Sequence, residues 1–261
     1  MTLWRERLRW WLFPGLNLHA RLRFRVLPLF FASPKSQDSV FLDAGCGNGM
    51  LSYAAWRLGY RVVAVSLKQD EIAKCRSLFN DLLGISEQRL EFRLHDLYAI
   101  QGLGMLFDEI VCSEVLEHIE RDGEVCRSFW NILKVGGALH LCVPFADHPD
   151  HRAEILDRCE SGGHVRPGYT ESTLRVLLEP IGFRITTIFG LGGPMRQWVN
   201  KRMITLQQRG AVASSALLAI VTWPFWGVER AGGFRVPYLS LIHISEPTRL
   251  LSISYAVFCL K

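Results

Sequence analysis

An α/β fold with a doubly wound, mostly parallel sheet is predicted for this chain of 261 residues by two features of its sequence. Short apolar runs of strand length alternate with longer stretches of helical periodicity from residue 40 onward. The first of these strands leads into a turn with glycine at every second position, at Gly45, Gly47 and Gly49. Such alternation implies right-handed βαβ crossovers, which place helices on both faces of one sheet.

Each expected element has a local signal that begins or ends it. One helix follows the glycine turn directly, a second spans residues 69–83 and stops at Gly84, and a third spans residues 122–134 and stops at the glycine pair 136–137. Thr170 begins a further helix. The expected strands are residues 40–42, 61–65, 89–94, 107–112, 138–143 and 183–188.

The glycine turn is the most specific motif in the chain. It has the pattern D-x-G-x-G-x-G, beginning at Asp43 and ending at Gly49, and it lies between a strand and a helix. Glycine lets a backbone approach a ligand closely and adopt positive φ angles, and the N–H groups at such a junction can bind the ligand. A dinucleotide fingerprint of the form G-x-G-x-x-G fails, because its third glycine would be residue 50, which is Met50.

This motif resembles the first motif of the class I S-adenosylmethionine (SAM)-dependent methyltransferases, and the resemblance extends over residues 40–188. It implies a Rossmann-like fold with SAM as the cofactor. The glycines would pass under the methionine part of SAM, while Asp43 would hold nearby backbone and, through water, the amino group of SAM. The cofactor-binding residues assigned to this turn are Asp43, Gly45, Cys46, Gly47, Asn48 and Gly49.

The chain departs from this family after the second strand. The family usually has an acid there that binds both ribose hydroxyls, whereas this chain has Ser66. The cyclopropane-synthase branch of the superfamily has a similar hydroxyl and a polar side chain five residues later, which here is Glu71. Ser66 and Glu71 are therefore expected to contact the ribose together. The alternative is that Asp70 and Glu71 only favour a helix N-terminus.

Two further segments complete the expected cofactor site by resemblance. Asp96, followed by Leu97, matches the acid that accepts a hydrogen bond from the adenine amino group, and the alternative is a solvated loop aspartate. After the fourth strand, residues 112–119 resemble the family's "EVLEH" segment, in which Ser113 and Glu114 would line the cofactor pocket.

Two histidines are the candidate catalytic bases, which a hydroxyl acceptor would require. His118 ends the "EVLEH" segment, where a histidine is often structural. His164 lies within residues 145–169, which are expected over the active site, in a stretch that resembles a lid or helix entry of related methyltransferases. No metal is expected, because the spacing of His148 and His151 is too unspecific to indicate a metal site.

The two flanks of the domain suggest an amphiphilic acceptor or an enzyme next to a membrane. Residues 1–34 mix arginines with aromatic residues and form a basic arm or lid, which could also lie on an anionic membrane. Residues 35–190 form the SAM-binding domain and residues 191–238 an apolar helical region. Within the latter, residues 210–228 are uncharged and just reach transmembrane length, but membrane-surface contact or burial against the domain fits their polar residues better.

Composition excludes several classes of protein. The formal net charge of +5 is mildly basic and lacks the clustering of a nucleic-acid-binding surface, so no nucleic acid partner is expected. The cysteines are scattered without a C-x-x-C pair, which suits a reducing cytoplasm rather than a disulfide framework. The expected location is therefore cytoplasmic with peripheral membrane contact, and the sequence leaves the oligomeric state open.

The last 23 residues, Leu239 to Lys261, resemble the translation of a short-read sequencing adapter. We therefore expect them to take no part in the fold. On this hypothesis the natural chain is cut off near Tyr238, and its seventh, antiparallel strand is missing. The alternative is a genuine β-rich end of the protein.

The sequence thus predicts a class I SAM-dependent methyltransferase that acts on a small-molecule or lipid-like acceptor. Two alternatives stay open. The Ser66 and Glu71 pattern also fits a cyclopropane-synthase-like enzyme that modifies lipids, and the fold alone would fit a non-catalytic SAM-binding partner protein. An intact glycine motif and Asp96 argue against the second alternative, because a protein without cofactor would not need them.

Overall fold

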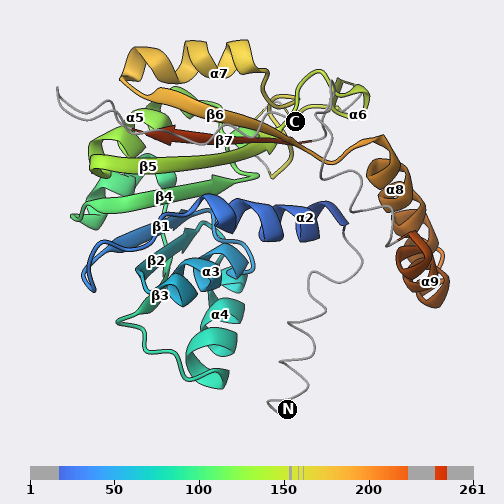
Figure 1. Ribbon diagram of the computed structural model, residues 1–261, viewed down its shortest axis with the longest axis horizontal. Helices are drawn as coiled ribbons and strands as arrows, with labels where there is room; N and C mark the ends of the chain where they lie inside the picture. Colours follow the sequence, from blue (N-terminus) through green and yellow to red (C-terminus); the bar gives the residue numbers. More distant parts are fainter. Residues whose placement is uncertain (1–17, 153–154, 158, 161, 223–238, 246–261) are drawn as a thin grey trace.

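Seven strands form one sheet in the computed structural model, which describes residues 18–152, 155–157, 159–160, 162–222 and 239–245. The strand order is β3-β2-β1-β4-β5-β7-β6 (Figure 1). Strands β1 to β5 run parallel to their neighbours, and β7 is antiparallel to both β5 and β6. This order confirms the predicted Rossmann-like α/β fold, whose switch point lies between β1 and β4, where ligands bind in such sheets.

The strands follow the predicted apolar runs closely. Their bounds are β1 Val40–Ala44, β2 Arg61–Ser66, β3 Leu90–Leu94, β4 Phe107–Ser113, β5 Leu133–Pro144, β6 Arg184–Leu191 and β7 Leu239–Ser245. Side chains alternate between the two faces of the sheet, so that in β1 Phe41 belongs to one buried core and Leu42 to the other.

Helices connect the strands and cover both cores. They are α2 Leu18–Val26, α3 Met50–Leu58, α4 Gln69–Cys75, α5 Asp122–Ile132, α6 Pro149–Arg152, α7 Glu171–Leu178, α8 Pro194–Gln208 and α9 Val212–Thr222. The 3-10 helices are η1 Leu27–Phe30, η3 Leu97–Leu103, η4 Leu116–His118 and η5 Glu179–Ile181, and α4 continues as the π-helical segment η2 Arg76–Leu82. Thr170 caps α7 through a reciprocal capping box with Thr173, as the helix start predicted at Thr170 requires.

One predicted boundary is wrong. The glycine pair 136–137 was expected to end a helix, but α5 already ends at Ile132 and the pair lies inside β5. A Cβ on Gly137 would come within 2.8 Å of the backbone oxygen of Asp108. Glycine is therefore required here by the close approach of β4, which the sequence pattern alone does not reveal.

The expectation that Leu239 to Lys261 takes no part in the fold is also wrong for its first seven residues. Residues 239–245 form β7 and fill the space between β5 and β6, while residues 246–261 lie outside the described ranges. A segment with β-branched residues supplies the backbone groups that two neighbouring strands leave unpaired. This placement does not depend on where the segment comes from, and its resemblance to an adapter stays a hypothesis.

The two flanks meet at one end of the molecule, where α8 and α9 form a helical pair beside α2 (Figure 1). Leu18 of α2 is buried with Val199, Met203 and Ala219, and its backbone N–H donates to Asn200 Oδ1 at 2.9 Å. Helix α9 has only 11 residues, and none of the helices in the described ranges is long and apolar enough to cross a membrane.

Candidate functional site

A cavity of about 500 Å³ lies at the carboxyl ends of β1, β2 and β4. It gathers eleven of the twelve residues predicted to bind the cofactor, and Gly49 is the exception. Those residues are Asp43, Gly45, Cys46, Gly47, Asn48, Ser66, Glu71, Asp96, Leu97, Ser113 and Glu114. Of the two predicted bases, His118 lines the cavity directly.

The glycine turn is held in place mainly by the protein itself. All three glycines have positive φ angles, and the N–H groups of Gly45 and Cys46 both donate to the carbonyl of Val65, at 2.9 and 2.8 Å. A Cβ on Gly45 would lie 2.3 Å from Val115, and one on Gly49 would lie 2.6 Å from the Phe79 ring. These two glycines therefore allow the turn to pack against its neighbours.

Gly47 is different, because a Cβ there would meet nothing within 4 Å. Its φ angle of +50° is the only constraint that the described protein atoms place on it. The space beside Gly47 belongs to the cavity. The position is therefore open on the side where a ligand would lie.

Asp43 is a buried carboxyl group at the end of β1, 1 % exposed. Ser52 Oγ of α3 donates to Asp43 Oδ2 at 2.5 Å. Burial raises the pKa of Asp43 to about 6, although the hydrogen bond from Ser52 and the nearby Arg23 both oppose this rise. The carboxyl group thus ties the glycine turn to the helix that follows it.

Ser66 and Glu71, expected to act together, are in contact. Ser66 Oγ donates to Glu71 Oε2 at 2.7 Å and accepts from the backbone N–H of Lys68 at 3.1 Å. Lys68 Nζ lies 3.6 Å from Glu71 Oε1. The hydroxyl group therefore orients a carboxylate towards the cavity, at the place where the family usually has a single acid.

Asp96 performs a local task as well as lining the cavity. Its Oδ1 accepts from the backbone N–H of Tyr98 at 2.9 Å and so caps η3, which Leu97 begins. Among the described residues its second oxygen has no hydrogen-bond partner. One carboxylate oxygen therefore holds the loop and the other is available to a ligand.

Sequence reasoning missed Arg23, which reaches the cavity from α2. Its Nη1 lies 3.2 Å from Glu114 Oε2. Burial raises the pKa of Glu114, while Arg23 and then His164 oppose the rise. The arm was predicted to act as a lid, but a run of arginines at helical spacing gives no signal of which one turns inward.

Three polar atoms at this point of the cavity are buried without a hydrogen-bond partner among the described residues: Arg23 Nε, Ser113 Oγ and Glu114 Oε1. Unpaired buried groups are costly, so they indicate a ligand with polar groups of its own. Glu114 is also the one non-glycine residue with positive φ, at 57°, in the part of the chain that the structure describes. Strain of this kind is concentrated at functional sites.

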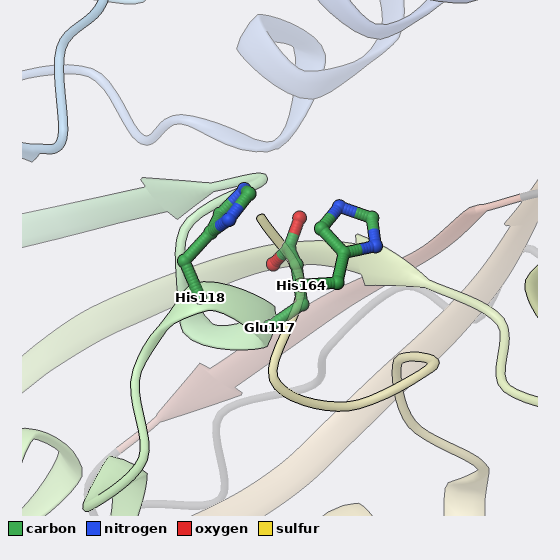
Figure 2. A group of neighbouring side chains, drawn as sticks. All are labelled: Glu117, His118 and His164. Atoms are coloured by element: carbon green, nitrogen blue, oxygen red, sulfur yellow. The ribbon is translucent and has the colours of Figure 1, made fainter. Parts of the chain in front are cut away.

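His118 and His164 come together with Glu117, although they are distant in sequence (Figure 2). The two rings are 4.7 Å apart, and His118 Nδ1 lies 2.9 Å from the carbonyl oxygen of Gly163. Glu117 is fully buried, and one ligand atom from each of the three residues lies within 4.8 Å of the others. The cluster could hold a divalent cation, which the sequence did not predict because its members come from η4 and a separate loop.

His148 and His151 lie outside this cavity. Both are buried, His148 Nε2 is 2.7 Å from Gln197 Oε1, and His151 Nδ1 is 2.9 Å from the carbonyl oxygen of Phe145. These contacts join the loop after β5 to α8. The pair has a structural environment, in line with the expectation of no metal there.

Known proteins similar to this chain are methyltransferases. The human mitochondrial ubiquinone biosynthesis O-methyltransferase is 28 % identical over 160 residues, which are 58 % of this chain and 42 % of that protein. The ubiquinone biosynthesis O-methyltransferase of Xanthomonas axonopodis pv. citri is 34 % identical over 135 residues, 51 % of this chain and 55 % of that protein. The chain thus spans about half the length of these relatives.

A solved structure shows the same fold. Magnesium protoporphyrin IX methyltransferase from Synechocystis, with bound S-adenosylhomocysteine (SAH), is 14 % identical with a TM-score of 0.59, over 90 % of this chain and 86 % of that one. The family model for a methyltransferase domain matches residues 16–188, which are well over half of the chain. The chain therefore belongs to the methyltransferase-domain family, as its glycine turn predicted.

Proposed function

We propose that this protein binds SAM in the cavity and transfers its methyl group to an oxygen atom of a small acceptor. The observation that carries the proposal is the glycine turn, whose open face at Gly47 borders the same cavity as buried, unpaired polar atoms. SAM has an ammonium group, a carboxylate and a ribose, which suit these atoms. When bound, SAM supplies a methyl group that its sulfonium already activates.

The residues of the chain would bind the cofactor from several sides. Arg23 would hold the carboxylate of the methionine part, and Glu114, which already pairs with Arg23, would accept from the ammonium group. Glu71, oriented by Ser66, would accept from the ribose hydroxyls. Asp96 would accept from the adenine amino group through the oxygen that does not cap η3.

His118 is the proposed general base, with His164 beside it. If its Nδ1–H donates to the carbonyl of Gly163, the neutral ring has Nε2 available to accept a proton from the acceptor hydroxyl. Fully buried Glu117 next to both rings favours their protonated form during transfer. A divalent cation bound by this cluster is the alternative, and it would be detected as activity lost on chelation.

The proposed acceptor is an amphiphile with a hydroxyl group. Both curated relatives are named as O-methyltransferases of ubiquinone biosynthesis. A hydroxyl acceptor gives a base next to the cofactor a purpose that an amine acceptor would not require. We also propose that the enzyme works at the surface of a membrane, where such an acceptor would be dissolved.

Calorimetric titration with SAM, SAH and NAD tests the cofactor. We expect binding of SAM and SAH and no binding of NAD. Incubation with labelled SAM and a lipid extract, followed by mass spectrometry of the labelled product, then identifies the acceptor atom. A methyl ether supports the proposal, and a cyclopropane ring would instead favour the lipid-modifying alternative. Binding without any labelled product from extract or lysate would favour a non-catalytic SAM-binding protein.

A further inference from the structure

Helix α9 exposes its large apolar side chains and buries its polar ones. Leu217, Ile220 and Val221 are 61 %, 69 % and 62 % exposed. Ser215 and Thr222 are buried on the opposite side. A helix on the surface of a domain in water normally has the reverse arrangement. The exposed side, which we call the α9 face and define as Leu217, Ile220 and Val221, therefore lacks a partner of its own polarity.

Hydrogen bonds to α8 hold α9 in this orientation. Ser215 Oγ donates to the backbone oxygen of Met203 at 3.2 Å and accepts from Gln207 Nε2 at 3.1 Å. Rolling the helix to bury the α9 face would break both bonds and expose Ala219, which packs with Met203. The exposure of the apolar side is thus specified by the packing.

The charge of the helical pair points to one class of partner. The segment from 194 to 222 contains four basic residues, Arg196, Lys201, Arg202 and Arg209, and no acidic residue. Arg202 and Arg209 are exposed, and Arg202 lies over the ring of half-exposed Trp198 at 5.8 Å. Exposed arginine, tryptophan and aliphatic side chains together are typical of helices that lie on anionic lipid.

We infer that the α9 face docks onto the surface of an anionic lipid bilayer. Helix α9 has 11 residues, which at about 1.5 Å per residue is far shorter than a bilayer, so it lies on the surface and does not span it. The inference names the surface for the membrane contact proposed above and rests on that contact. It does not rest on methyl transfer.

Helix α2 connects this surface to the cavity. Its first residue, Leu18, is buried with Val199 and Met203 of α8, and its Arg23 lines the cavity and pairs with Glu114. A bilayer under α9 would therefore lie near the helix that closes the cavity. An amphiphilic acceptor could then pass from the bilayer to the site without crossing water.

Co-sedimentation with vesicles tests the α9 face. The full chain is incubated with phosphatidylglycerol vesicles and, separately, with phosphatidylcholine vesicles. The test variant is the triple replacement Leu217→Ser, Ile220→Ser and Val221→Ser. The control is Leu106→Ser, Val135→Ser and Val176→Ser, which removes a similar exposed apolar area elsewhere.

We expect the test variant to partition onto phosphatidylglycerol at least tenfold more weakly than the unchanged protein, while the control variant binds as before. Binding to phosphatidylcholine should be weaker throughout, because arginines contribute through anionic headgroups. Equal binding of test and control variants would overturn the inference. So would a dimer in light scattering that the test variant dissociates, because a second copy would then cover the face.

Calorimetric titration of SAM without vesicles separates this inference from the proposed function. Both triple variants should bind SAM like the unchanged protein, since none of their replaced residues lines the cavity. Loss of vesicle binding with normal SAM binding supports the α9 face. Normal vesicle binding with no SAM binding in any protein would overturn the proposed function and leave the α9 face intact.

Discussion

The cavity has two walls that are built in different ways. The strand-end wall consists of the segments after β1, β2, β3 and β4, residues 43–49, 66–71, 95–98 and 113–115. The insertion wall consists of Arg23 and Phe24 of α2, His118 and Ile119, and Glu160 and Gly162 of the loop after β5. Each segment of the first wall is a short contiguous motif. The second wall is assembled from parts of the chain up to about 140 residues apart.

This difference suggests a division of tasks. The strand-end wall is held by the sheet, as shown by the bonds from Gly45 and Cys46 to Val65 of the neighbouring strand. The insertion wall contains the histidine cluster and the one basic side chain that pairs with Glu114. We therefore expect changes in the strand-end wall to affect cofactor binding and changes in the insertion wall mainly to affect transfer. Five predictions test this comparison, from the largest expected effect to the smallest.

Replacing Gly47 by valine should abolish detectable SAM binding in calorimetry. The side chain would occupy the open side of the turn, and the φ angle of +50° disfavours it as well. Gly84→Val is the matched control, because Gly84 also has positive φ and open surroundings but lies away from the cavity. Both variants should lose similar thermal stability. If Gly47→Val binds SAM as Gly84→Val does, the turn does not hold the cofactor.

Replacing His118 by alanine should lower the rate of transfer by about 10²–10⁴-fold, the usual contribution of a general base. The dissociation constant for SAM should change little, because the effect belongs to the insertion wall. His95→Ala is the control, since His95 lines the same cavity from the strand-end wall. Single-turnover rates measure the effect. Equal rates for the two variants would remove His118 from the mechanism.

The raised pKa of Asp43, about 6, makes stability depend on pH. An unfolded aspartate titrates near about 3.9, so the folded state retains a proton that the unfolded state has lost between these values. The stabilisation is complete below about pH 4, is lost as the pH rises through about 6, and amounts to about 3 kcal/mol.

Asp43→Asn should therefore be more stable than the unchanged protein at about pH 8 and lose most of that advantage near about pH 4. Urea unfolding at the two pH values measures the margin. Asp81→Asn, at an exposed position, controls for the loss of one negative charge. A margin that is the same at both pH values would contradict the burial argument.

Replacing Arg23 by alanine tests where the comparison breaks down, because Arg23 belongs to the insertion wall but is proposed to bind the cofactor. We expect SAM affinity to fall by about 1.5–3 kcal/mol, the range for a hydrogen bond with a charged partner. Arg25→Ala, exposed on the same helix, should bind normally. Unchanged affinity in both variants would restrict Arg23 to holding Glu114.

The smallest effect is expected for Glu71→Gln. The amide keeps the shape but loses the charge that strengthens hydrogen bonds to the ribose hydroxyls, so SAM and SAH should both weaken by about 1 kcal/mol. Asp70→Asn, exposed on the same helix and paired with Lys74, is the control. Calorimetry with SAH measures the change. If the two variants bind alike, Glu71 acts only at the helix end.

The sequence by itself determined the strand-end wall, because its chemistry lies within single motifs. A strand followed by Asp43 and alternating glycines can form only a few local structures, and the order of the parallel strands brings their ends to one edge. The bond between Ser66 and Glu71 follows from a spacing of five residues at a helix start. Eleven of twelve expected residues therefore meet at the cavity.

Only the tertiary structure decided the insertion wall. Which arginine of α2 turns inward depends on how Leu18 and Leu22 are buried, and the meeting of His118 with His164 depends on a loop that no periodicity describes. The role of Gly137 and the place of β7 were decided by neighbouring strands. Contacts between distant segments have no local signal, because they arise from the packing of complete elements rather than from the spacing of residues along one of them.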